Sequence, residues 1–245
     1  MNIKASQNRV RAAAVALAVA GILFVLYPAI RPFSDESTLA GAQAFASNAW
    51  VVSHVMGMLG FLGVALGLLG LYVASAGTPA ARQSFWAVVF GWLGTGLTLT
   101  YYGAEVYGLR AIGREALSQH DASVLALADQ VRGVPGEVIF AIGLIWVAVA
   151  GVMAASASWR LAGLARWGAL VVAAGLALYI PQFFFGQPVR IAHGALLAAG
   201  CLCLAAGLWR AKSAPDRPAR TRALVRPQVA VTARASGNGT ARLPA

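Results

Sequence analysis

The sequence has little charge for its length. Only 11% of its 245 residues are charged, whereas 59% are hydrophobic, and the mean hydropathy is +0.71. An average soluble domain carries about 25% charged residues, so the composition excludes an ordinary soluble protein and predicts a membrane protein. Alternation of apolar and polar residues, the pattern of a membrane β-strand, is also missing. An all-α membrane protein is therefore expected.

The sequence is also poor in cysteine and in catalytic motifs. Its two cysteines, Cys201 and Cys203, lie two residues apart on a predicted helix, where their side chains point roughly 200° apart. They cannot pair with each other, and we interpret both as small core residues. No phosphate-binding Walker loop, His-Glu-x-x-His sequence, Ser-His-Asp order or spaced cysteine set occurs. Short motifs therefore assign no function.

Long uncharged stretches are what the sequence does have. Charged residues form short islands that separate six such stretches, and a membrane-spanning helix needs roughly 20 apolar residues. Each stretch holds one span, including the longest, whose polar, alanine-rich first part is too hydrophilic to cross. The pattern predicts six transmembrane helices at about 12–30, 50–76, 84–108, 137–158, 165–184 and 190–209, within a transmembrane domain of residues 12–210.

The first stretch resembles a secretory signal peptide because Lys4, Arg9 and Arg11 precede it. It is longer than the usual hydrophobic region of about 7–15 residues, and it ends in Tyr27-Pro28 and Arg31-Pro32 rather than at a small-residue cleavage site. We interpret it as an uncleaved first helix that follows a basic N-terminus, residues 1–11.

The distribution of Lys and Arg predicts the orientation, because cytoplasmic segments carry their excess. With the N-terminus inside, 14 basic residues are cytoplasmic and five are outside, namely Arg31, Arg110, Arg114, Arg132 and Arg190. Without the last eight basic residues the split is 6 to 5, yet seven of the eight carboxylates then lie at the outer side. Both termini are predicted to be cytoplasmic. The excess of Arg over Lys, 17 to 2, is typical of a GC-rich bacterial genome and suggests a bacterial plasma membrane.

The net charge of +11 does not indicate nucleic-acid binding. The excess lies beside the predicted spans and in residues 211–245, a basic tail rich in Pro, Ala and Arg. Such a segment lacks the apolar residues that a packed core requires. We expect a disordered cytoplasmic tail, and the lipid bilayer rather than nucleic acid as the partner.

Polar side chains within the predicted spans gather near one depth, at the outer ends. His54, Glu137 and His193 lie in the first turns of descending helices, and Tyr101, Tyr102, Glu105, Tyr179 and Gln182 lie in the last turns of rising ones. Carboxylates inside membranes usually face the bundle interior or a water-filled cavity. The pattern predicts an outward-facing polar pocket whose candidate residues are Glu105, Tyr101, Tyr102, Gln182, Tyr179, His193 and Glu137.

Helical angles indicate which faces point inward. On the third predicted helix, one arc holds the small and polar residues Gly91, Gly94, Thr98, Tyr101, Tyr102 and Glu105, which favours close packing against other helices. The fifth helix has a similar arc with Gly168, Gly175, Tyr179 and Gln182, and the short turn at residues 183–188 makes the fifth and sixth helices antiparallel neighbours.

The second predicted helix behaves differently. Gly60, Gly63, Gly67 and Gly70 form a narrow arc, which predicts close helix packing without a ligand. His54 lies nearly opposite this arc, so the angle places it away from the shared pocket. In the connection at residues 110–135, Asp121 is a predicted N-cap for a short helix whose apolar stripe is Val124, Leu127, Ala128 and Val131.

The leading functional hypothesis is that the pocket binds a proton, a cation or a small lipid-soluble ligand, for binding or transport. Glu105 is central to it, because a membrane carboxylate among tyrosines can titrate or hold a cation. The alternative for Glu105 is a carboxylate at the water boundary, bonded to Tyr101 or Tyr102 or paired with Arg110, Arg114 or Arg190.

A second hypothesis is a redox or metal-dependent membrane protein. His54 and His193 could be the two axial ligands of a b-type haem, or could join Glu105 as two histidines and one carboxylate around iron or zinc. A third is an accessory subunit without its own chemistry. The sequence leaves enzyme, transporter and accessory subunit open.

Overall fold

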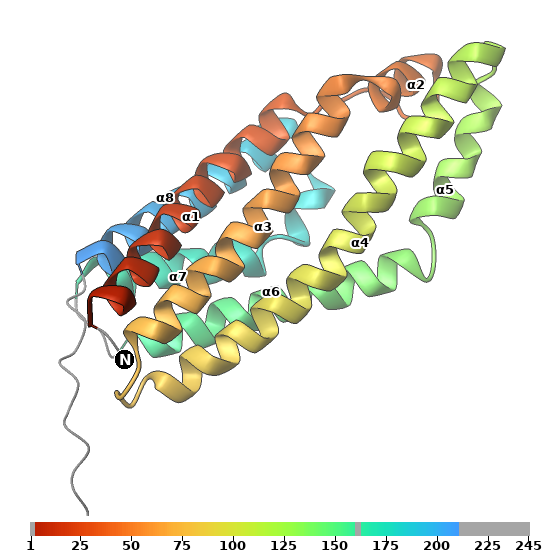
Figure 1. Ribbon diagram of the computed structural model, residues 1–245. Coiled ribbons are helices and arrows are strands. Elements are labelled where there is room, and N and C mark those ends of the chain that lie inside the picture. Colours follow the sequence, from red (N-terminus) through yellow and green to blue (C-terminus); the bar gives the residue numbers. More distant parts are fainter. Residues whose placement is uncertain (1–2, 160–162, 211–245) are drawn as a thin grey trace, which may run out of the picture. The chain divides into compact units, whose positions relative to one another are not determined.

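A computed structural model describes residues 3–159 and 163–210 (Figure 1). Within these ranges the chain is helical, without a strand, which confirms the all-α prediction. The predictions for residues 211–245 lie outside the described residues. In chain order the elements are α1 (Ile3–Ile30), α2 (Leu39–Ala46), α3 (Asn48–Ala74), α4 (Ala81–Gln119), the 3₁₀ helix η1 (Ala122–Ala126), α5 (Leu127–Arg132), α6 (Gly136–Ser158), α7 (Leu164–Ala177), the 3₁₀ helix η2 (Pro181–Phe184) and α8 (Gln187–Arg210).

Four of the described helices are long and apolar enough to cross a membrane: α1 from Lys4 onward, α3, α6 and α8. Helix α4 is long, but Gly, Thr and Tyr interrupt its apolar residues. Helix α7 is apolar but has only 14 residues, about 21 Å at 1.5 Å per residue. The described part of the chain is therefore all-helical and has four candidate spans, with α4 and α7 as two further helices of the bundle that connect them in sequence.

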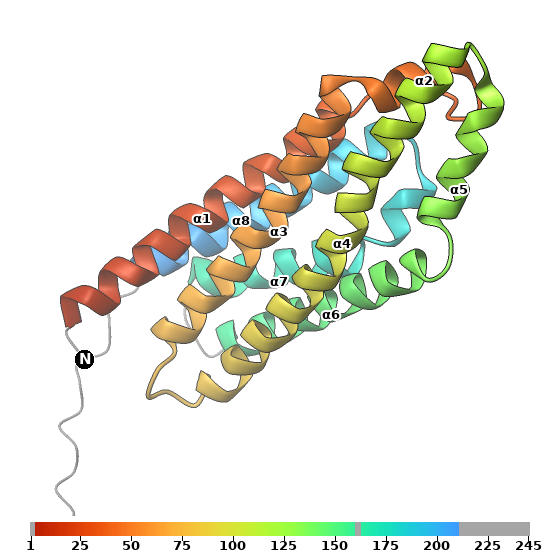
Figure 2. The same cartoon turned by 45° about the vertical axis from the view of Figure 1, so that its right-hand side comes forward.

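The six longer helices form a closed ring. Going round it, α1 packs on α3, α3 on α4, α4 on α6, α6 on α7, α7 on α8, and α8 on α1 again. Figures 1 and 2 show these helices aligned along one axis, with successive members running in opposite directions. Side chains from all six meet in one buried core.

Glycines set the spacing of two pairs in this ring. A Cβ at Gly63 of α3 would lie 2.7 Å from the Ala16 carbonyl oxygen of α1, and one at Gly70 would overlap Ala13 Cβ. This confirms that the glycine arc of α3 serves close packing, against α1. In the α7–α8 pair, a Cβ at Gly200 would lie 2.7 Å from the backbone nitrogen of Val172, so α7 and α8 are the predicted close neighbours.

One end of the bundle carries a second, smaller apolar cluster. It consists of α2, Trp50 of α3, residues 109–119 of α4, η1 and α5, and we call it the end cluster (Figure 2). Helix α4 continues to Gln119, well beyond the predicted end at 108. Leu109, Gly113 and Ala116 are buried, and a Cβ at Gly113 would lie 2.7 Å from the Ala42 carbonyl oxygen and from Phe45 Cβ. Packing against α2 therefore extends α4 through its charged segment.

Helices η1 and α5 close this cluster. The Asp121 side chain accepts a hydrogen bond of 2.8 Å from the Ser123 backbone nitrogen, which confirms the predicted N-cap. Ala128 is buried as expected, but Leu125 is buried in place of Leu127, which is 46% exposed. The segment begins as a 3₁₀ helix with three residues per turn, and this shifts the apolar stripe relative to α-helical spacing.

Candidate functional site

A cavity of about 660 Å³ lies beside the end cluster, with walls from α1, α3, α4, α5, α6, η2 and α8. With the exception of Ile180, the side chains that line it are aromatic rings or charged groups. The rings belong to Tyr27, Phe33, His54, Tyr101, Tyr102, Phe140, Phe183 and Phe184. The charged groups are Arg31, Glu36, Glu105, Arg132, Glu137 and Arg190.

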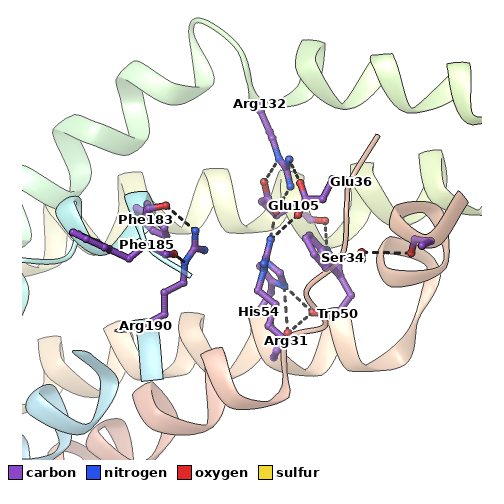
Figure 3. Close-up of polar contacts among 12 residues, drawn as sticks. Arg31, Ser34, Glu36, Trp50, His54, Glu105, Arg132, Phe183, Phe185 and Arg190 are labelled. Carbon is purple, nitrogen blue, oxygen red and sulfur yellow. Dashed lines mark hydrogen bonds and ion pairs between the residues drawn. The ribbon is translucent and has the colours of Figure 1, made fainter. Parts of the chain in front are cut away.

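Glu105, on the inward face of α4, is bound from two directions (Figure 3). Arg132 Nε donates to Glu105 Oε1 at 2.6 Å and Arg132 Nη2 to Oε2 at 3.3 Å. His54 Nε2 lies 3.5 Å from Oε2. The Glu105 backbone oxygen accepts a bond of 2.9 Å from Trp50 Nε1, which fixes α4 against α3. Glu105 is 7% exposed, so its charge is compensated by protein groups rather than by water.

Arg132 connects this pair to the segment between α1 and α2. Its Nη1 donates to Glu36 Oε2 at 2.5 Å, and Arg31 Nη2 donates to Glu36 Oε1 at 2.9 Å. Arg31, Glu36, Arg132, Glu105 and His54 thus form one charge network across four segments, the α1–α2 connection, α3, α4 and α5 (Figure 3). Burial disfavours the charged form of Arg132, but the carboxylates of Glu105 and Glu36 outweigh it and raise the pKa of Arg132 above its usual value.

Arg190, in the first turn of α8, is held differently. Its Nη2 donates to the Phe183 carbonyl oxygen at 2.7 Å and its Nε to that of Phe185 at 2.9 Å (Figure 3). Both Arg190 and Arg31 lie over the Phe33 ring, 5.4 and 4.7 Å from its centroid. Among the described residues, Arg190 is the cavity-lining arginine that has no carboxylate partner.

The structure divides the predicted site residues between two adjoining spaces. Tyr101, Tyr102, Glu105 and Glu137 line the large cavity. Tyr179, Gln182 and His193 line a small pocket of about 10 Å³ beside it, room for about one water molecule. Five residues line both spaces: Tyr27, Arg31, Phe33, Phe183 and Arg190.

Hydrogen bonds and ring contacts fix most of these residues. The hydroxyl oxygens of Tyr102 and Tyr179 are 3.0 Å apart, which joins the two spaces across the bundle. Tyr101 stacks on Phe140 with ring centroids 4.3 Å apart. Glu137 lies exposed in the first turn of α6, and its side chain makes no ion pair within the described ranges. The inward face predicted for the third helix is confirmed by the burial of Gly91, Gly94, Thr98, Tyr102 and Glu105.

The expectation that His54 points away from the shared pocket is wrong. His54 is 2% exposed, faces Glu105 and lines the large cavity. Its Nδ1 is 2.7 Å from the Trp50 carbonyl oxygen, and its ring packs edge-on against Tyr27. The glycine arc of α3 faces α1, so the nearly opposite side of α3 is free to face α4 and the interior of the ring.

The structure does not gather the predicted two-histidine, one-carboxylate set into a metal-binding group. In residues 3–159 and 163–210, no three His, Cys, Asp or Glu side chains form a group that could hold a metal ion. Both His54 nitrogens already face an acceptor, and His193 Nε2 is 2.7 Å from the Gly175 carbonyl oxygen of α7. Axial ligation needs a free nitrogen lone pair on each histidine, so His54 would have to leave one of its two partners, whereas His193 could keep its Gly175 partner only by ligating through Nδ1.

Four of the charged residues that line the cavity were not predicted as site residues: Arg31, Glu36, Arg132 and Arg190. Arg31 and Arg132 were treated only as charges flanking the spans, and the expected partners of Glu105 were Arg110, Arg114 or Arg190. Arg110 instead donates to Asn48 Oδ1 at 2.8 Å, and Arg132 takes its place at Glu105. The signal in the sequence that pointed to such a partner was Glu105 itself, because a buried carboxylate requires a charged partner.

Comparisons of this chain with protein-family models, with curated proteins and with solved structures find no match. The site geometry alone therefore carries the functional argument.

Proposed function

We propose that the chain is a six-span membrane protein with both termini in the cytoplasm and the end cluster outside. The direction of the chain supports the six spans. Helix α3 ends away from the end cluster and α6 begins beside it, so α4 must run the length of the bundle between them (Figure 1). By the same argument α7 and η2 return the chain from the end of α6 to the start of α8. The excess of basic residues that the sequence predicts for cytoplasmic segments, 14 to five, favours this orientation.

Cysteine labelling tests these crossings in a background without the two native cysteines. Ser118→Cys and Gly186→Cys are expected to react with a membrane-impermeant maleimide in intact cells, because both positions are exposed at the cluster end. Ala76→Cys and Trp159→Cys, exposed at the opposite end, are expected to react at least about tenfold more after lysis. Equal labelling of Ala76→Cys and Ser118→Cys in intact cells would contradict the crossing of α4.

We further propose that the large cavity binds a small amphipathic molecule, for binding or transport. The observation that carries this proposal is the cavity itself, whose 660 Å³ is lined by aromatic rings and charged side chains, most of them ion-paired. Ligand pockets typically measure about 300–1,000 Å³ and combine apolar walls with a few fixed polar groups. A simple cation is a poorer occupant, since Arg132 and His54 already face the Glu105 carboxylate.

A cavity-filling variant tests this function. Ile180 lines the cavity, so Ile180→Trp is expected to occupy part of it and to reduce, by about tenfold, the amount of any small molecule that co-purifies in mild detergent. Mass spectrometry of compounds released on denaturation measures this amount. The control is Ile22→Trp, at a 52% exposed position of α1, which should match the wild type. The proposal would be overturned if the wild type and both variants released the same amount of small molecule, or if the wild type released none.

A further inference from the structure

A second, apolar groove lies along the outside of α6 and α7. It measures about 360 Å³ and is lined by aliphatic side chains, including Ile145, Val149 and Val152 of α6 and Leu176 of α7. Ile145 and Val152 are 51% and 52% exposed. In the proposed six-span arrangement this face lies in the hydrocarbon layer, because α6 is an apolar candidate span.

The groove and the large cavity meet at one residue. Ile180 lines both of them. This junction exists because α7 ends at Ala177, after about 21 Å, whereas the hydrocarbon core is about 30 Å thick. Beyond Ala177 the chain turns into η2, so the wall between α6 and α8 is completed by a short 3₁₀ helix instead of a full span.

The charges near the junction favour an anion. Arg190 is fixed by two backbone carbonyl oxygens of the η2 segment, and these use two of the five N–H donors of a guanidinium group. Arg31 lies over the same Phe33 ring. Arg31 pairs with the Glu36 carboxylate, which is shared with Arg132, whereas within the described chain Arg190 has no carboxylate partner.

We propose that cavity and groove together form the site of an anionic membrane lipid, with its headgroup at Arg190 and Arg31 and an acyl chain along α6 and α7. The inference rests on the proposed ligand-binding function and specifies the ligand class. The lipid enters sideways from the bilayer past Ile180. Charge complementarity selects the headgroup, since a guanidinium group pairs with phosphate oxygens in a bidentate manner, and the aliphatic groove accepts the chain.

Lipid binding measured by native mass spectrometry tests this site, with phosphatidylglycerol and phosphatidylcholine of equal chain length as probes. The wild type is expected to bind phosphatidylglycerol about tenfold more tightly. Arg190→Gln should remove that preference, whereas Arg114→Gln, the same change at an exposed arginine of α4, should retain it.

A second pair of variants tests the groove. Val152→Trp is expected to weaken phosphatidylglycerol binding about fivefold or more by occupying the groove. Val15→Trp, at an equally exposed position of α1, should have no effect. Equal affinity for the two lipids, or binding unchanged by both Arg190→Gln and Val152→Trp, would show ordinary boundary lipid and overturn the inference. The proposed function fails separately, by identical small-molecule content in the Ile180→Trp and Ile22→Trp proteins.

Discussion

Glu105→Gln is expected to destabilise the protein by about 3 kcal/mol, in the range found when one partner of a buried ion pair is removed. The substitution preserves the shape of the side chain but removes the charge that faces both Arg132 and His54. Arg132 then retains only one carboxylate partner, Glu36. The Arg132 side chain is 23% exposed and cannot regain full hydration. The free energy of unfolding, measured by denaturant titration in mixed micelles, checks this value.

Glu36→Gln is the matched control, because Glu36 binds the same guanidinium group. Its side chain is 31% exposed, compared with 9% for Glu105, and partly exposed ion pairs contribute about 0–1 kcal/mol. We expect a loss of about 1 kcal/mol or less. The double variant Glu105→Gln with Arg132→Gln should be less destabilised than the sum of its single variants, by about 2 kcal/mol. Equal losses for Glu105→Gln and Glu36→Gln would contradict the central role of Glu105.

The helical class and the inward face of α4 were predictable because both depend on local periodicity. Apolar runs mark helices that a bilayer or a core must cover. On α4, small residues and one carboxylate share an arc, and Gly91, Gly94 and Thr98 are buried together as that arc predicts. The pairing of α7 with α8 also follows from local sequence, because the short connection between them leaves few other arrangements.

The orientation of His54 could not be predicted in this way. A helix in a ring has two neighbours and an interior side, and the glycine arc of α3 marks only the contact with α1. The predicted angle between His54 and the glycine arc is correct. The arc, however, faces α1 and not the interior of the ring. Such an assignment requires the order of helices in the ring, which depends on contacts between distant segments.

The charge network around Arg132 could not be predicted from the sequence for a related reason. Arg132 lies 27 residues after Glu105, on a six-residue helix that folds back over the cavity. Its place depends on the end cluster, where α4 continues through charged residues because α2 covers it. Charge counting treats Arg31, Arg132 and Arg190 as equal flanking charges, whereas in the structure all three line the cavity.

Gly168→Ala is expected to destabilise the bundle by about 3 kcal/mol, at the upper end of overpacking effects. A Cβ at Gly168 of α7 would overlap the Leu204 backbone nitrogen and would lie 2.8 Å from Leu204 Cα on α8. Backbone atoms cannot rotate away, so α7 and α8 must separate. The bond between His193 and the Gly175 carbonyl oxygen, which crosses the same interface, should lengthen or break. The midpoint of thermal unfolding in detergent measures the loss.

Gly96→Ala is the matched control, because it makes the same change in α4 where no atom lies within 4 Å of the new Cβ. Here the greater helix propensity of alanine should stabilise the protein by about 0.5–1 kcal/mol. A loss of stability for Gly168→Ala and a gain for Gly96→Ala would show that contact between backbones, rather than the intrinsic flexibility of glycine, determines where glycine is required. A neutral Gly168→Ala would contradict the close approach of the α7 and α8 backbones at this position.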